Sequence, residues 1–217
     1  MRKGLLLLLL LVGCGPQPAP QTVLRNSPPF SALDKVLEVH TLSHLGFGAP
    51  ISGGRLITVD HLSNGAHAYW KSQDHLRGPL IIMKQDRERD LALYRLKGPI
   101  NDLKALEVSS EPPRLGEEVY WLTHTQRQTI GLVRGWVVAI EKDRLQLDGW
   151  FHPGSSGTAV LRADGTLVAI GTAGTNWACN TSWLPFSELV IKDQVECLFR
   201  KSFFPSGMIA SRLDNWN

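Results

Sequence analysis

Residues 148–160 read DGWFHPGSSGTAV, and both the fold and the chemistry of the chain depend on this stretch. Four small residues, Gly154 to Gly157, follow a proline and precede the apolar segment Thr158 to Leu161. Because proline and glycine mark turns, the chain is expected to bend sharply here and then enter a strand. A hydroxyl on such a bend is exposed beside free backbone N–H groups, which is what acyl transfer needs. Taken alone, however, Gly-Ser-Ser-Gly is also ordinary loop composition.

Length and composition indicate a globular, mostly β protein. The 217 residues allow one large domain or a domain of two barrels, and 43% hydrophobic with 20% charged residues is typical of globular chains. Glycine is frequent and long helical patterns are few, which favours an all-β architecture. The net charge of +3 falls to +1 without Arg2 and Lys3, and basic residues do not cluster, so the sequence gives no case for nucleic acid as a partner.

The first residues have the pattern of an export signal. Arg2 and Lys3 precede a short apolar run, Leu5 to Val12, and Gly13-Cys14 follow. This end resembles a bacterial lipobox, which implies a signal peptide over 1–13, lipidation of Cys14 and anchoring to a membrane of the bacterial cell envelope. A plain secretory signal with a chance cysteine is the alternative. By resemblance to enterobacterial lipoproteins, Gly15 rather than aspartate favours the outer over the inner membrane of a Gram-negative host, with the domain in the periplasm or at the cell surface.

The other two cysteines, Cys179 and Cys197, leave two alternatives open. In an oxidising compartment they can form a disulfide, and two free buried cysteines are the other possibility. Spacing alone does not choose between them.

Short strands with turn signals between them fill most of the chain. Residues 14–30 are rich in proline and glutamine and read as a lipid-anchored linker, so we expect the folded domain over 31–217. The candidate strands are 36–41, 47–52, 55–59, 66–71, 80–83, 91–96, 117–122, 129–133, 135–140, 145–147, 157–161 and 167–172. Asp164-Gly165 predicts a hairpin turn, and apolar spacing over 187–201 predicts a C-terminal helix.

Three residues at predicted strand edges have the side chains needed for an activated hydroxyl. His61 follows the strand Arg55–Val59, Asp90 opens the strand Leu91–Leu96, and Ser156 lies in the small-residue turn. Each has an ordinary alternative, as a structural histidine, a surface charge or a loop serine. Found in the order His, Asp, Ser, they match a histidine base, the carboxylate that orients it, and a nucleophile.

These segments resemble the trypsin-like, chymotrypsin-fold serine proteases, in particular the bacterial HtrA-type branch. The similarity runs from about Gly46 to Gly174 and no PDZ-like domain follows it. Three segments carry it: SGGRLITVDH over 52–61, DLALYRL over 90–96 and LDGWFHPGSSG over 147–157.

The resemblance implies a fold, a set of roles and a reaction. The fold would be two six-stranded antiparallel β-barrels, the first at about 31–100 and the second at about 114–186, with the C-terminal helix at about 187–201. The roles would be general base for His61, orienting carboxylate for Asp90, nucleophile for Ser156, oxyanion hole for the N–H groups of Gly154 and Ser156, and substrate-binding strand edge for Thr172, Ala173 and Gly174. The reaction would be hydrolysis of protein or peptide substrates through an acyl-enzyme, with no metal and no cofactor. The sequence does not indicate an oligomeric state.

The chain also departs from the family pattern. Thr158 stands where the family usually has a second glycine, and its side chain is expected to crowd the backbone behind the nucleophile. Ser155 replaces the aspartate of zymogen-type members, so activation by insertion of a new N-terminus is not expected. Trp150 and Phe151 either narrow the specificity pocket or turn into the core. Two rival functions follow: a catalytically impaired lipoprotein that binds peptides without cleaving them, and a purely structural surface lipoprotein.

Overall fold

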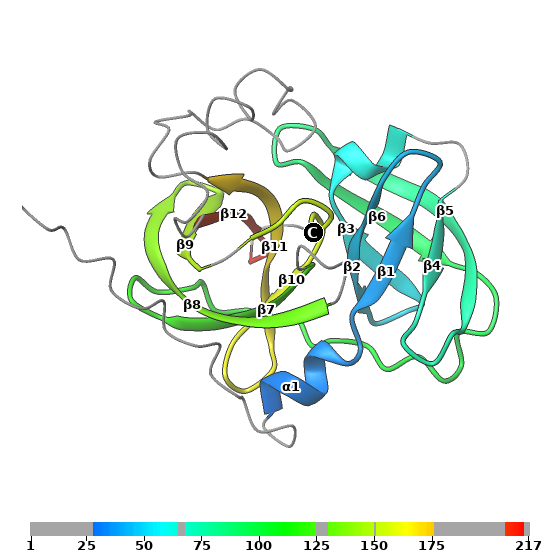
Figure 1. Ribbon diagram of the computed structural model, residues 1–217, viewed down its shortest axis with the longest axis horizontal. Coiled ribbons are helices and arrows are strands. Elements are labelled where there is room, and N and C mark those ends of the chain that lie inside the picture. The colour runs from blue at the N-terminus through cyan, green and yellow to red at the C-terminus, as the bar shows by residue number, and fades with distance from the viewer. Residues whose placement is uncertain (1–27, 65–67, 125–129, 150, 176–206, 215–217) are drawn as a thin grey trace, which may run out of the picture.

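Two closed antiparallel barrels of six strands each stand side by side, as the sequence predicted (Figure 1). The computed structural model describes residues 28–64, 68–124, 130–149, 151–175 and 207–214. Within these residues, no helix is long and apolar enough to cross a membrane. The predicted signal peptide, the linker up to residue 27, all three cysteines and the predicted helix at 187–201 lie outside the described residues.

The first barrel has the ring order β1-β2-β3-β6-β5-β4. Its elements are β1 (Leu37–His40), β2 (Leu45–Ile51), β3 (Arg55–Thr58), the short 3-10 helix η1 (Asp60–Asn64), β4 (Tyr69–Lys71), β5 (Arg77–Asp86) and β6 (Leu91–Leu96). A turn containing Gly53 and Gly54 joins β2 to β3, and both glycines have positive φ, which other residues adopt only with strain. The pairing of β3 with β6 brings the ends of these strands together, so the segments carrying His61 and Asp90 become neighbours.

The second barrel has the ring order β10-β11-β12-β9-β8-β7. Its strands are β7 (Glu118–His124), β8 (Ile130–Glu141), β9 (Arg144–Asp148), β10 (Ala159–Leu161), β11 (Leu167–Thr175) and β12 (Gly207–Arg212). The sequence predicted separate strands at 129–133 and 135–140, and this prediction was wrong. They form the single strand β8, because Gly135 continues the pairing with Val119 instead of ending it.

Two elements were not foreseen from the sequence. The strand β12 closes the second barrel between β11 and β9, and it comes after the segment in which we expected the barrel and its C-terminal helix to end. The helix α1 (Pro28–Leu33) begins inside the segment expected to be a tether and packs against β7 and β10.

A shared hydrophobic core joins the barrels. One cluster of buried side chains includes Phe47 and Leu56 from the first barrel and Ala159, Leu161 and Ile170 from the second. A separate cluster fills the second barrel, with Trp121, Leu145 and Val160 among its members. Since the shared cluster crosses the junction, the barrels pack as one unit rather than as two linked domains.

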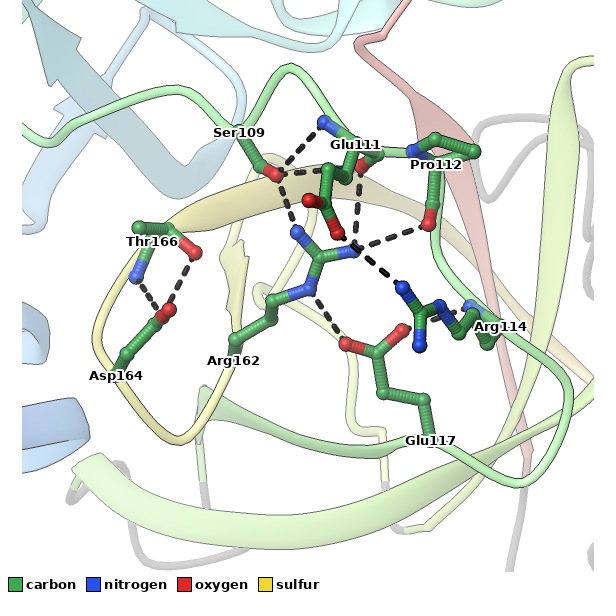
Figure 2. Close-up of polar contacts among 8 residues, drawn as sticks. All are labelled: Ser109, Glu111, Pro112, Arg114, Glu117, Arg162, Asp164 and Thr166. Carbon is green, nitrogen blue, oxygen red and sulfur yellow. Dashed lines mark hydrogen bonds and ion pairs between the residues drawn. The ribbon is translucent and has the colours of Figure 1, made fainter.

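Arg162, just after β10, ties the linker between the barrels to the second barrel (Figure 2). Its guanidinium donates to the carboxylate of Glu117, to the hydroxyl of Ser109 and to the carbonyl oxygens of Glu111 and Pro112, the last two at 3.2 and 3.0 Å. A planar guanidinium has donors on every edge, so one side chain can hold several parts of a loop at once. These contacts hold the linker where it approaches β7 of the second barrel.

Candidate active site

His61 and Asp90 are joined by two hydrogen bonds. The Nδ1 atom of His61 lies 2.7 Å from Oδ2 of Asp90, and the backbone N–H of His61 donates to Oδ1 at 3.0 Å. The side chains are only 8% and 13% exposed. With the carboxylate at Nδ1, that nitrogen carries the proton and Nε2 is left with its lone pair available, which is the form a general base needs.

Asp90 has an uncommon backbone conformation. Its φ is 55°, in the left-handed region, where aspartate is tolerated better than most residues. The residue ends the turn between β5 and β6, so this geometry sets the carboxylate against His61 where β6 starts. Asp60, the competing carboxylate beside His61 in sequence, is engaged elsewhere: its Oδ1 accepts hydrogen bonds from Ser63 and Gln85.

Ser156 lies on two successive tight turns. In the first, the N–H of Ser155 donates to the carbonyl of His152 at 3.1 Å, and Gly154 has a φ of 88°. In the second, the N–H of Thr158 donates to the carbonyl of Ser155 at 3.1 Å, and Gly157 has a φ of 84°. A positive φ at the third position is the mark of a type II turn and requires glycine. The sequence predicted a sharp bend here, and the structure resolves it into this pair.

The turns leave two backbone donors unused. Among the described residues, neither the N–H of Gly154 nor that of Ser156 donates to another group. These are the two donors that the family resemblance assigns to the oxyanion hole. The hydroxyl of Ser156 makes no hydrogen bond to the ring of His61 in the described part of the chain, and in a substrate-free site such a contact is commonly long.

The first barrel reaches across to the turn that carries Ser156. The N–H of Phe47 donates to the carbonyl of Ser156 at 2.8 Å. A Cβ atom on Gly46 would lie 2.5 Å from that same carbonyl oxygen and 2.5 Å from the side chain of Leu62, the residue after His61. The side chain of Leu62, next to His61, and the carbonyl of Ser156 therefore both lie against Gly46 of the first barrel.

Ser155 is buried and its hydroxyl is occupied. Its Oγ lies 2.9 Å from Oγ1 of Thr123 and accepts the N–H of His124 at 2.8 Å. It is fully shielded from solvent. Of the two adjacent serines, Ser156 is thus the one whose hydroxyl makes no hydrogen bond to another described residue.

Thr158 fits the space behind the turn. It is fully buried, and its methyl group packs over Gly171 of β11, where an added Cβ would come within 2.9 Å of it. Glycine at 171 leaves room for this methyl group, which a side chain at 171 would contact. The Oγ1 atom of Thr158 has no hydrogen-bond partner among the described residues.

Phe151 has turned into the core. It is 4% exposed and belongs to the cluster inside the second barrel. Of the two alternatives given for Trp150 and Phe151, Phe151 thus takes the one in which the side chain turns into the core. Trp150 lies outside the described residues.

The strand β11 presents a half-paired edge at Thr172, Ala173 and Gly174. On one side, Ala173 and Gly174 pair with β12, after a register shift at Thr172. On the other side, β10 pairs with β11 only as far as Ile170. On that side, no strand in the described part of the chain pairs with residues 172–175. An extended peptide can add to an edge of this kind through backbone hydrogen bonds.

His124, at the end of β7, is a neighbour of the turn over residues 152–155 that the sequence analysis did not single out. Its ring stacks on Phe47 with centroids 4.8 Å apart, and its Cδ2 would be 3.3 Å from a Cβ on Gly154. Burial lowers the pKa of His124, the charge of Glu38 opposes this, and His152 and His40 add to the lowering. Its Nε2 is buried without a hydrogen-bond partner among the described residues. No sequence motif indicates a role for this histidine or for Thr123, because both lie just past the end of a predicted strand.

Metal ligands do not gather in the described residues, where no group of three or more His, Cys, Asp or Glu side chains is placed to hold an ion.

Comparison with known proteins identifies the family. Residues 46–170, more than half of the chain, match the family described as the trypsin-like peptidase domain, and this range includes His61, Asp90 and Ser156. The chain belongs to this family. It is 29% identical over 154 residues to Protease Do-like 1, chloroplastic, from Arabidopsis thaliana, a match covering 64% of this chain and 34% of that protein. The chain thus spans about a third of the length of this curated relative.

Solved structures share the fold. The HtrA-type protease AlgW with a tripeptide has a TM-score of 0.60 and 23% identity, with 67% of this chain and 53% of that chain covered. An inactive serine-to-alanine mutant of Rv3671c from Mycobacterium tuberculosis has a TM-score of 0.64 and 15% identity, with 90% of both chains covered. A serine endoprotease from Yersinia pestis has a TM-score of 0.60 and 20% identity over 82% of this chain and 65% of its own. HtrA-type proteases are therefore among the structural neighbours, as the resemblance implied.

Proposed function

We propose that the protein is a serine endopeptidase that cleaves peptide bonds through an acyl-enzyme on Ser156. The observation that carries this proposal is the two-point contact between His61 and Asp90, because it orients the imidazole with a free Nε2. The pair of turns around Ser156, with the unused N–H donors of Gly154 and Ser156, also supports the proposal. Membership of the trypsin-like peptidase family supports it as well.

The reaction would use three side chains and two backbone groups. Nε2 of His61 takes the proton of the Ser156 hydroxyl as Oγ attacks the carbonyl carbon of the substrate. The N–H groups of Gly154 and Ser156 stabilise the oxyanion of the tetrahedral intermediate. The imidazolium, paired with ionised Asp90, then gives its proton to the leaving amine, and a water molecule activated by His61 releases the acyl group.

The substrate would be an extended segment of protein. The half-paired edge at Thr172, Ala173 and Gly174 supports this, since it offers backbone groups to an added strand. The tripeptide named with the structural neighbour AlgW is consistent with the same substrate class.

Fluorophosphonate labelling tests the activity. We expect the wild-type protein to be labelled and to digest casein, and we expect both signals to vanish in Ser156→Ala and in His61→Ala. Ser110→Ala is the matched control, since Ser110 is exposed and lines a different surface, and it should behave like the wild type. Labelling that persists in Ser156→Ala would assign the reaction to another serine, and a folded wild-type protein without labelling would favour peptide binding without cleavage.

We propose in addition that Cys14 anchors the chain to a bacterial envelope membrane, on the strength of the lipobox-like sequence that ends in this cysteine. Full-length protein produced with an alkyne analogue of palmitate should incorporate the label, and Cys14→Ser should not. Equal labelling of the two would contradict the anchor while leaving the peptidase proposal intact.

A further inference from the structure

A pair of buried hydroxyls lies directly behind the oxyanion turn. Thr123 at the end of β7 is 1% exposed and Ser155 in the turn is fully buried, and their oxygen atoms are 2.9 Å apart. Among the described residues, neither side chain makes a hydrogen bond to His61 or Asp90. Most buried polar groups in proteins are hydrogen-bonded, and both of these hydroxyls are, so the arrangement around them is well defined.

Thr123 holds the turn at both of its ends. Its Oγ1 accepts the N–H of His152, the first residue of the turn, at 3.1 Å. The same atom contacts Oγ of Ser155, the last residue of the turn, and Ser155 also accepts the N–H of His124. The turn is therefore fastened to the end of β7 at its first and fourth residues, and only Pro153 and Gly154 lie between these points.

One arrangement of hydroxyl protons satisfies both side chains. If Ser155 donates to Thr123, then Thr123 can donate to the carbonyl of His124, which is 3.3 Å away. Both protons then have acceptors, and Oγ1 of Thr123 uses its two lone pairs for Ser155 and His152. In the opposite direction, the Ser155 proton would have no acceptor among these groups. The network therefore has a preferred polarity as well as a fixed position.

The peptide held between these points carries the Gly154 N–H. In a type II turn the central peptide is rotated by about half a turn relative to a type I turn, so the turn type decides which way this N–H faces. The ring of His124 lies against Gly154 from behind, with Cδ2 3.3 Å from where a Cβ would be. The hydrogen bonds at the two ends of the turn and the packing of His124 against Gly154 together select one orientation of the Gly154 N–H.

We propose that Thr123, acting through Ser155 and His152, is the positioning residue that sets the oxyanion donor of Gly154. The proposal rests on the proposed peptidase function, since it assigns the Gly154 N–H to an oxyanion. The fastening is neutral throughout, and a buried carboxylate in place of Ser155 would need a charged partner to be stable. Among the described residues, the hydrogen bonds of Thr123 and Ser155 that hold the turn therefore involve neither a cation nor a new N-terminus.

The test compares Thr123→Val with Thr123→Ser. Valine keeps the shape of threonine and loses the hydroxyl, whereas serine keeps the hydroxyl. Thr166→Val is the matched control, because the hydroxyl of Thr166 bonds Asp164 in the hairpin between β10 and β11 and not the turn over 152–155. The measurements are kcat and KM with fluorescein-labelled casein, the rate of fluorophosphonate labelling, and amide hydrogen exchange.

We expect the variant to lose stabilisation of the transition state and not affinity for the substrate. In Thr123→Val, kcat and the labelling rate should fall by about 10- to 100-fold while KM changes little, a partial version of losing an oxyanion donor. Exchange of the His152 amide should speed up, whereas that of Val119 within β7 should not. Thr123→Ser and Thr166→Val should keep activity near that of the wild type.

Two other outcomes would overturn the proposal in different ways. Wild-type rates in a folded Thr123→Val protein would refute the positioning role and leave the peptidase function standing. A folded wild-type protein without labelling would refute the peptidase function and the positioning role together. Should Thr123→Val fail to fold, Ser155→Ala removes the same hydrogen bond from the other side and is read in the same way.

Discussion

The two barrels hold their parts of the candidate site by different means. The first barrel places His61 through a charged side-chain partner, Asp90, in contact at two points. The second barrel places Ser156 and its neighbouring N–H groups through backbone turns, glycines at positive φ and the neutral hydroxyl pair of Thr123 and Ser155. The imidazole of His61 is oriented by a single partner residue, whereas Ser156 and the backbone donors beside it are positioned by the conformation of the whole segment.

This difference predicts how each half of the site fails. A change in the first barrel should alter the chemistry of the imidazole without disturbing the fold, because a single pair is affected. A change in the second barrel should move a backbone segment, so its effects on activity depend on how much space surrounds the substituted atom. The predictions below test this contrast.

The largest effect is expected from Asp90→Asn. The amide keeps the shape of the carboxylate but presents a donor where His61 needs an acceptor, so the imidazole adopts the wrong tautomer, and kcat should fall by about 10⁴-fold. Steady-state hydrolysis of fluorescein-labelled casein measures it, with Asp102→Asn as a surface control. A loss smaller than tenfold would mean that the contact seen here does not orient the catalytic base.

A smaller loss is expected from Gly154→Ala, the matching change in the second barrel. Alanine is strained at a φ of 88°, and its Cβ would press on His124, so the turn should shift and kcat should fall by about 10²- to 10³-fold with little change in KM. Gly116→Ala is the control, since Gly116 has a φ of 79° but nothing within 4 Å of an added Cβ. An equal loss of activity in the two variants would show that backbone strain alone, and not the position of the turn, lowers kcat.

Stability should respond to the fit between Thr158 and Gly171. In Gly171→Ala the new methyl group meets Thr158, Met208 and Phe151, which should lower the free energy of unfolding by about 1–3 kcal/mol. Thr158→Gly/Gly171→Ala should recover part of this loss, because one of the two closest contacts of the new methyl group, the one with Thr158, is removed. Urea unfolding of the two single variants and the double variant measures the coupling, and strict additivity would contradict the proposed fit.

The smallest effect concerns His124 and pH. Burial lowers its pKa in the folded protein below the ordinary 6.5, so below that pH the unfolded chain takes up a proton that the folded protein does not. Stability from this group is present above pH 6.5 and is lost as the pH falls toward the lower folded value. Denaturant unfolding between pH 7.5 and pH 5 should therefore show a smaller loss in His124→Phe than in the wild type. Parallel curves would mean that this ring does not titrate differently on folding.

The site residues of the first barrel could be predicted from the sequence more fully than those of the second. His61 and Asp90 stand in side-chain motifs, and their contact could be anticipated because each motif ends or begins a strand. The turn at Ser156 was also predicted, since proline and glycine encode its geometry locally. Thr123 could not be found, because its role depends on the end of β7 meeting a turn far along the chain, and a threonine near a strand end has no distinctive pattern.

Two further features were beyond local reasoning. The strand β12 is separated from its partner β11 by a long segment, and six residues of moderate apolar character do not reveal a barrel closure. The room for Thr158 is made by Gly171 on a neighbouring strand, so the sequence showed the departure from the family pattern without its compensation.

The most direct measurement is trapping of the acyl-enzyme. The protein would be mixed with p-nitrophenyl acetate, quenched in acid and analysed by intact mass and peptide mapping, with Ser156→Ala and Asp90→Asn alongside. We predict a single acetyl group on the peptide that contains Ser156, none on that peptide in Ser156→Ala, and slow formation in Asp90→Asn. An acetyl group on any other residue, or hydrolysis of casein by Ser156→Ala, would contradict the assignment of Ser156 as the nucleophile.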